Sequence, residues 1–177
     1  KLAAIINPDV VVVTNIGEAH GENFRDKKSK AAEKLKLARN ASLIVYCLDQ
    51  KLVKDEIHRS YHGRRTLTWS VADPAADVYA EVKDTEGSWT EIGITYGGER
   101  FIIRLPFTDR ASVENAITAV TVSLAEGVGQ EKIIRSVQSL PAVAMRMEVK
   151  LGINGSTLIE DYYNSDPGSL VMALDFM

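Results

Sequence analysis

Two short apolar runs without alternation frame the start of the chain. Residues 10–15 form a mostly β-branched run and residues 43–46 form a second one. Strands that are buried on both faces have this pattern, because neither face of a parallel sheet is left to solvent. Between them, from about residue 26 to 40, three apolar residues recur at helical spacing: Ala31, Leu35 and Ala38. The pattern predicts a strand, a helix and a second strand, joined as a right-handed parallel crossover.

The pattern changes after a weaker predicted helix over residues 52–61. Four short segments are typical of strands, and Gly97-Gly98 between two alternating runs favours a tight hairpin. We therefore expect a small antiparallel meander, with its strands at residues 66–69, 77–82, 90–96 and 100–105.

Two helices, over residues 112–126 and 130–140, are predicted next, because apolar residues again recur at helical spacing. A linker follows, and we place a domain boundary near Met145 that divides residues 1–144 from 145–177. Beyond it we expect a hairpin-like strand pair, at 147–151 and 156–160, and a final helix that begins with Asp166 as N-cap and Pro167 in its first turn. The predicted fold class is α/β: a partial parallel sheet with flanking helices, plus the small meander.

Composition narrows the classes of function. The chain has 177 residues, a formal net charge of −3 and a pI of about 5.7, which argues against a nucleic-acid-binding protein. The single cysteine, Cys47, excludes an internal disulfide framework and suits a reducing, cytoplasmic compartment. No apolar run approaches the ~20 residues that cross a bilayer, so we expect no membrane association. The first residue is Lys1, which indicates a chain that was cut or processed.

Three groups of residues carry candidate chemistry, although phosphate-binding glycine loops of the G-x-x-x-x-G-K-[ST] and G-x-G-x-x-G types are absent from the sequence. The first group is the polar loop over residues 14–20, at the carboxyl end of the first strand, where open α/β sheets bind ligands. It ends in His20, whose imidazole is either a metal ligand or an ordinary surface side chain.

The second candidate is Lys34. At helical spacing it lies ~60° from Ala31 and ~40° from Ala38, so it borders the apolar stripe. The pattern by itself favours a lysine that lays its stem along the core and keeps its ammonium in solvent. The alternative is a lysine with a lowered pKa that reacts as a free amine.

The third group joins Arg146, on the linker, to the acidic and aromatic residues 160–167. That segment lies where a strand passes into a helix N-terminus, a suitable place for anions and sugar hydroxyls. The structural alternative is a loop with a helix cap at Asp166, and we expect that cap in either case.

In this order the three groups resemble the Mur ligases, a family of ATP-dependent amide-forming enzymes. Residues 7–20 resemble the family's "P-(apolar run)-T-N-I-G-E-A-H" strand and loop, and residues 161–167 are similar to its "D-D-S-Y-N-A-N-P". Between them, Glu33-Lys34-Leu35-Lys36-Leu37 followed by Asn40-Ala41 also matches. The resemblance covers nearly the whole chain in collinear order. It implies the second half of the central ATPase domain, followed by the start of a Rossmann-like C-terminal domain.

The resemblance also implies a reaction, and it is greatest to the family member that acts on the tripeptide precursor of peptidoglycan. That enzyme uses ATP and Mg²⁺ to join UDP-N-acetylmuramoyl-tripeptide to D-alanyl-D-alanine through an acyl phosphate. Its partners are small-molecule substrates, without nucleic acid or membrane. Because the family's phosphate-binding loop is not in the sequence, we expect the 177 residues alone to be inactive.

Individual roles follow from the matched motifs, residue by residue. The resemblance implies that His20 coordinates Mg²⁺ and that Lys34 becomes a carbamate ligand of the same ion, because an ammonium would repel Mg²⁺ and carboxylate-like oxygens attract it. It further implies that Asn115, Arg146 and Asp161 contact the nucleotide. It also implies that Tyr163 and Asn164 border the substrate cleft.

The sequence departs from the family pattern at one motif. Residues 109–115 stand where the family has "G-x-H-N-x-x-N", and only the last asparagine, Asn115, is kept. This variant resembles the form that is fused ahead of an alanine racemase, whose pyridoxal phosphate would bind outside these residues. Two alternatives therefore remain: a non-catalytic module of such a bifunctional protein, or a relative with another acceptor, similar to folylpolyglutamate synthase or cyanophycin synthetase.

Overall fold

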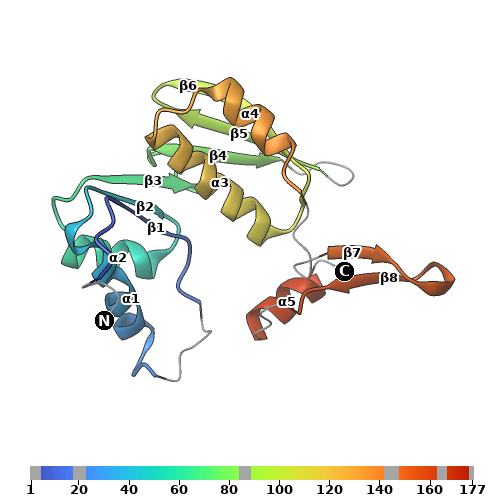
Figure 1. Ribbon diagram of the computed structural model, residues 1–177, viewed down its shortest axis with the longest axis horizontal. Coiled ribbons are helices and arrows are strands. Elements are labelled where there is room, and N and C mark those ends of the chain that lie inside the picture. The colour runs from blue at the N-terminus through green and yellow to red at the C-terminus, as the bar shows by residue number, and fades with distance from the viewer. Residues whose placement is uncertain (1–4, 18–22, 84–88, 142–147, 163–166, 176–177) are drawn as a thin grey trace.

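The structure is a computed structural model that describes residues 5–17, 23–83, 89–141, 148–162 and 167–175. Six strands form one sheet in the order β1-β2-β3-β4-β5-β6, and two further strands form a separate sheet (Figure 1). The larger sheet contains β1 (Val10–Val13), β2 (Leu43–Cys47), β3 (Thr66–Ser70), β4 (Val78–Lys83), β5 (Thr90–Tyr96) and β6 (Glu99–Leu105). The α/β class predicted from the sequence is confirmed.

The first three strands are parallel, as predicted for the two apolar runs. Val10 pairs with Leu43, and Ile44 pairs with Thr66, so β2 lies between β1 and β3. All five residues of β2 are buried. Within the described residues the prediction that the first run is buried on both faces is wrong, because no residue of β1 is fully buried and Val12 is 40% exposed.

The helix predicted over residues 26–40 is divided in two. Asp26 caps α1 (Lys27–Leu35) by accepting a 2.7 Å hydrogen bond from the backbone N–H of Ser29. After Leu35 the chain tightens into a 3₁₀ helix, η2 (Lys36–Asn40). The next helix, α2 (Lys51–Ser60), confirms the weaker prediction.

The predicted meander is correct for three of its four strands. Strand β3 belongs to the parallel part, since it pairs in parallel with both β2 and β4. Strands β4, β5 and β6 are antiparallel, and Gly97 and Gly98 join β5 to β6 with φ of 59° and 82°, as the predicted hairpin requires. The meander is also continuous with the parallel strands, because β4 begins beside the end of β3, where Trp69 pairs with Val78.

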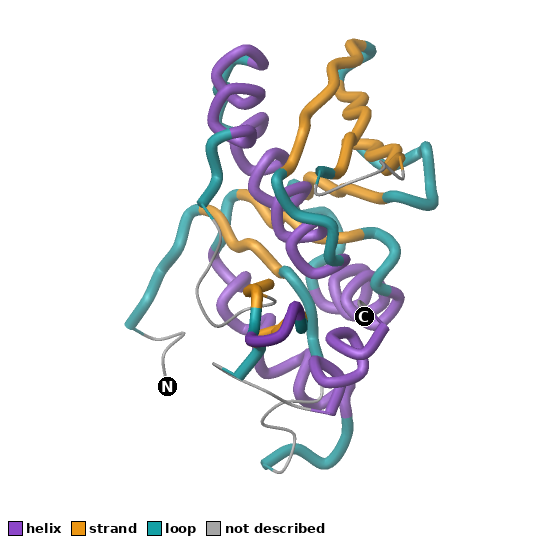
Figure 2. The backbone as a smooth tube through the Cα atoms, turned by 90° about the vertical axis from the view of Figure 1, so that its right-hand side faces the viewer, coloured by secondary structure: helices purple, strands orange, loops and turns teal. Residues whose placement is uncertain are grey.

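Helices cover both faces of the sheet, which Figure 2 shows from a second side. On one face, α1 and α2 pack on β2 through residues such as Leu35, Ile57 and Ile44. On the other, α3 (Arg110–Ala125) and α4 (Gln130–Gln138) pack on β3–β6, with Ile117 and Ile94 fully buried. These two layers form the hydrophobic core, in which burial of each aliphatic side chain of this size stabilises the fold by about 1.5–3 kcal/mol.

The C-terminal part forms the predicted strand pair and helix. Strands β7 (Glu148–Leu151) and β8 (Thr157–Glu160) are antiparallel, joined through the short 3₁₀ helix η3 (Ile153–Gly155), and α5 (Pro167–Asp175) follows. The boundary predicted near Met145 and the cap predicted at Asp166 lie outside the described residues. Within the described ranges, none of the helices is long and apolar enough to cross a bilayer.

The burial of Cys47 leads to a chemical prediction. Burial, more than any neighbouring group, raises the pKa of its thiol to about 11. The thiolate is the reactive form, so at pH 8 only roughly one thiol in a thousand is ionised. We expect a disulfide reagent to label Cys47 at least ~100-fold more slowly in the folded chain than in guanidinium chloride, followed by absorbance of the released thiol. Equal rates in the two conditions would contradict this packing.

Candidate functional site

The carboxyl ends of the parallel strands meet at one edge of the sheet. There the segment Thr14–Gly17, which follows β1, lies beside the first turns of α3. A hollow of about 90 Å³ is lined by Thr14 and Asn15 from this segment and by Asn115 from α3, together with Arg110, Ala111, Glu114 and Thr118. Two motifs a hundred residues apart in the sequence are therefore brought together at the edge where α/β sheets bind ligands.

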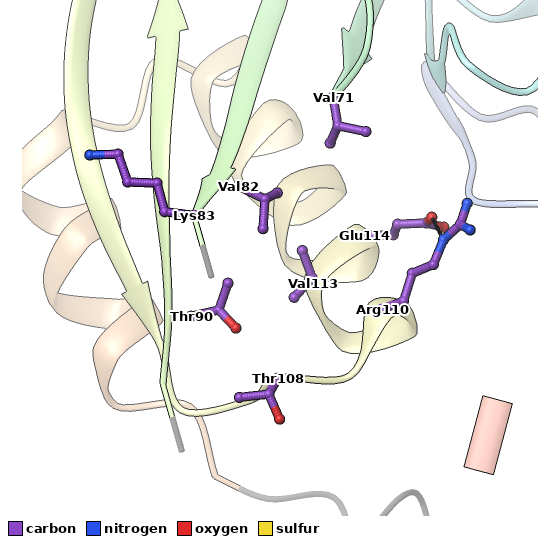
Figure 3. A pocket seen from close by; sticks show the side chains of 8 residues that line it. All are labelled: Val71, Val82, Lys83, Thr90, Thr108, Arg110, Val113 and Glu114. Carbon is purple, nitrogen blue, oxygen red and sulfur yellow. Dashed lines mark hydrogen bonds and ion pairs between the residues drawn. The ribbon is translucent and has the colours of Figure 1, made fainter. Parts of the chain in front are cut away.

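An ion pair on α3 forms part of this hollow. Arg110 Nε donates a 2.7 Å hydrogen bond to Glu114 Oε1, and this bond raises the pKa of the Arg110 guanidinium. The same two residues line a larger hollow of about 330 Å³ on their other side (Figure 3). In that view Lys83 directs its ammonium away from the other labelled side chains, and the Arg110 guanidinium lies beside the Glu114 carboxylate.

Asp49, just after β2, ties the strand ends together. Its carboxylate accepts hydrogen bonds from the Ser70 hydroxyl and, at 2.9 Å, from the backbone N–H of Val71. Ser70 is fully buried, and its oxygen accepts in turn from the backbone N–H of Asp73 at 2.7 Å. The turn that follows β3 is therefore fastened to the residue that follows β2.

Two side chains hold the Thr14–Gly17 segment. Gln50 Nε2 donates to the carbonyl of Thr14 at 2.6 Å, and Lys30 Nζ donates to the carbonyl of Gly17 at 2.7 Å. Lys30 is only 2% exposed, although it belongs to a helix whose other lysines face solvent. The sequence pattern does not single out Lys30, because only the tertiary position of the loop distinguishes it from the rest of the basic run.

Lys34 is exposed, one helical turn beyond Lys30. The expected position beside Ala38 assumed α-helical spacing as far as residue 38. The 3₁₀ turns after Leu35 advance by about 120° per residue instead of 100°, which carries Ala38 roughly 60° further round and away from Lys34. Lys34 therefore lies further from the buried Ala38 than the sequence pattern predicts, and its amine is exposed to solvent.

The remaining predicted site residues are placed unevenly. Asn115 is exposed at the hollow, and Asp161 is half-buried just after β8. Four others, His20, Arg146, Tyr163 and Asn164, lie outside the described residues. Among the residues that the structure does describe, no three His, Cys, Asp or Glu side chains gather as a metal site.

Comparison with known proteins gives consistent matches. The family model described as Mur ligase middle domain matches residues 1–123. The UDP-N-acetylmuramoyl-tripeptide–D-alanyl-D-alanine ligase of Bacillus subtilis is 24% identical over 176 residues, 98% of this chain and 37% of that protein. The UDP-N-acetylmuramate–L-alanine ligase of Desulfatibacillum aliphaticivorans is 28% identical over 161 residues, 89% of this chain and 35% of that protein.

A solved structure shares the fold. The MurF ligase of Thermotoga maritima, crystallised in complex with ADP, superposes with a TM-score of 0.79 at 22% identity, over 98% of this chain and 40% of that one. The chain thus spans less than half the length of the proteins that it matches.

The hydrogen bonds of Asp49 predict a stabilising role. We expect Asp49→Ala to lower the free energy of unfolding by about 1–2 kcal/mol, because the buried Ser70 hydroxyl and the Val71 N–H lose an acceptor. Urea unfolding followed by fluorescence of the buried Trp69 measures it. Asp55→Ala, on the exposed surface of α2, is the matched control and should change stability by less than about 0.5 kcal/mol. Equal losses in the two variants would refute the role of Asp49.

Proposed function

Because this chain belongs to the Mur ligase family, we propose that it forms part of an ATP-dependent ligase that joins D-alanyl-D-alanine to UDP-N-acetylmuramoyl-tripeptide. In this proposal residues 1–144 are the C-terminal half of the central ATPase domain, and residues 145–177 begin the Rossmann-like C-terminal domain. The relative from Bacillus subtilis carries this activity in its name and aligns with 98% of the chain.

One observation carries the proposal: Asn115 meets Thr14 and Asn15 at a single hollow on the carboxyl edge of the sheet. The resemblance assigns the first to the adenine and places the other two on the loop that precedes the metal-binding histidine. Their convergence supports a nucleotide site there, and the related ligase crystallised with ADP supports the nucleotide's identity.

Arg110 and Glu114 supply polar groups where the family motif is altered. Residues 109–115 lack the family's glycine, histidine and first asparagine, yet the guanidinium and carboxylate of this ion pair border the hollow beside Asn115. A guanidinium binds phosphate or stacks on a base, and a carboxylate accepts from an exocyclic amine. We propose that this pair takes over part of the contact with the nucleotide.

The donor groups at the hollow suit Mg²⁺. Thr14 and Asn15 present oxygen atoms, which this hard cation prefers, and Mg²⁺ ordinarily keeps several waters and the substrate phosphates as its other ligands. When bound, the ion would neutralise charge on the transferred phosphoryl group. We propose that His20 and Lys34 hold it, with Lys34 as the carbamate formed when its neutral amine adds CO₂ and loses a proton. The exposure of Lys34 leaves its amine accessible to CO₂.

The reaction has two steps. The terminal carboxylate oxygen of the tripeptide attacks the γ-phosphorus of ATP, which forms an acyl phosphate and releases ADP. The amine nitrogen of D-alanyl-D-alanine then attacks the acyl carbon, phosphate leaves, and the nitrogen loses a proton to give the amide. Catalysis is mainly positioning and charge neutralisation. Arg146 and Asp161 would contact the nucleotide as the domains close, and Tyr163 and Asn164 would border the substrate cleft.

The setting follows from the same proposal. The substrates are small soluble molecules of cytoplasmic peptidoglycan synthesis, and neither nucleic acid nor a membrane takes part. The acceptor is the most specific part of the proposal, because a ligase named for L-alanine and UDP-N-acetylmuramate also matches this chain, at 28% identity.

The altered motif favours a second candidate function. A chain that has lost three residues of the adenine motif could instead be a non-catalytic module of a protein whose activity is that of an attached alanine racemase. Binding of ATP by the full-length polypeptide separates the two candidates, because only the ligase requires it.

We expect the full-length polypeptide to release phosphate from ATP only when Mg²⁺, UDP-N-acetylmuramoyl-tripeptide and D-alanyl-D-alanine are all present, and the 177-residue chain alone to release none. L-alanine with UDP-N-acetylmuramate, and a folate with glutamate, are the control acceptor pairs. Turnover with either control pair and not with D-alanyl-D-alanine would reject the proposed acceptor, and turnover by the 177-residue chain would reject the need for further segments.

We expect Asn115→Ala to raise the KM for ATP about tenfold, with kcat within about threefold of the wild type, because one polar contact to the bound nucleotide is lost. Glu131→Ala, on the exposed side of α4, is the control and should leave the KM unchanged. An unchanged KM in Asn115→Ala would place the nucleotide elsewhere.

A further inference from the structure

Lys30 is the most unusual charged residue that the structure describes. It is 2% exposed, whereas Lys28 before it and Lys34 after it on α1 are exposed. Burying an ammonium is unfavourable unless hydrogen-bond acceptors compensate the lost hydration. The 2.7 Å bond from Nζ to the carbonyl of Gly17 is such a compensation. Because Lys30 is buried, it does not serve to keep the protein surface soluble, as an exposed lysine can.

The carbonyl that Lys30 binds belongs to the segment that borders the hollow. Thr14–Gly17 runs outside the ladder of β1, so its backbone oxygens need partners other than a neighbouring strand. Gln50 donates a hydrogen bond to the carbonyl of Thr14, and Lys30 donates one to the carbonyl of Gly17. The segment is therefore held at both of its ends by side chains from two different connections.

The helix that carries Lys30 is itself fixed. Ala31 and Leu35 are buried, and the hydroxyl of Tyr61 donates a 2.6 Å hydrogen bond from the end of α2 to the carbonyl of Leu35. Lys30 thus projects from an anchored helix toward a segment outside the regular elements. The packed helix α1 therefore restrains the Thr14–Gly17 segment through Lys30.

From these contacts we propose that Lys30 is a positioning residue, which acts with Gln50 to hold Thr14–Gly17 in the conformation that forms one wall of the hollow. Lys30 does not touch the ligand in this assignment. It fixes the backbone from which Thr14 and Asn15 face the hollow. The consequence for ATP rests on the proposed function, whereas the constraint on the segment does not.

The test uses the full-length polypeptide and compares Lys30→Met with Lys28→Met. Both variants remove one positive charge from α1, but only the first removes the buried donor. The first measurement is the initial rate of thermolysin cleavage at the Asn15–Ile16 bond, identified by product mass, because proteolysis reports local opening. We expect this rate to rise about tenfold in Lys30→Met and to stay unchanged in Lys28→Met, with the thermal midpoint nearly constant.

The second measurement separates positioning from simple stability. We expect the KM for ATP to rise about tenfold in Lys30→Met while kcat stays within about twofold, because the wall of the hollow is disordered but the reacting groups are retained. If the wild type turns over no ATP, the proposed function fails, and the cleavage rate still decides the role of Lys30.

A second variant covers the case in which Lys30→Met does not fold. Gln50→Ala removes the other donor, and Gln50 makes no side-chain cap for α2, so the helix should survive the change. Faster cleavage at the same bond in Gln50→Ala supports the proposal. Unchanged cleavage in a folded Lys30→Met, or, where that variant does not fold, in Gln50→Ala, would overturn it, as would an equal effect in Lys28→Met.

Discussion

The parallel pairing of β1, β2 and β3 is the constraint on which the rest of the structure depends. Parallel strands end at a common edge, so the residues that follow each strand are brought together whatever their separation in sequence. Here that edge receives the Thr14–Gly17 segment, Asp49 and the turn after Ser70. The antiparallel strands β4–β6 extend the sheet and give α3 and α4 a surface on which to pack.

At this edge of the sheet, side chains form hydrogen bonds with backbone groups that have left the strand ladder. Backbone groups that leave a sheet lose their ladder partners, and an unpaired buried group is unfavourable. The carboxylate of Asp49, the amide of Gln50 and the ammonium of Lys30 each bond a backbone group at this edge. These polar residues keep the loops in fixed positions, and the hollow depends on that order.

Helix α3 supplies the other wall. It is capped by Asp109, which accepts from the backbone N–H of Ser112 at 2.8 Å, so its first turn is well defined. Its buried face, through residues such as Ile117, sets the rotation of the helix, and that rotation brings Arg110 and Glu114 to both hollows. Asp109, Ala111 and Ser112, which stand where the family motif has its glycine, histidine and first asparagine, lie at the start of this same helix.

Local pattern was enough for several features of this protein. The apolar run at β2, the Gly97-Gly98 hairpin and the apolar stripe of α3 depend on burial, backbone freedom and spacing within one segment, so the sequence alone determined them. The ordered motifs also led to the correct family.

Tertiary structure decided which segments meet. The partners of β3 and the burial of Lys30 in preference to Lys34 depend on contacts between distant segments. A residue's own pattern shows whether it can be buried. Only the fold determines what covers it, because the covering group comes from elsewhere in the chain.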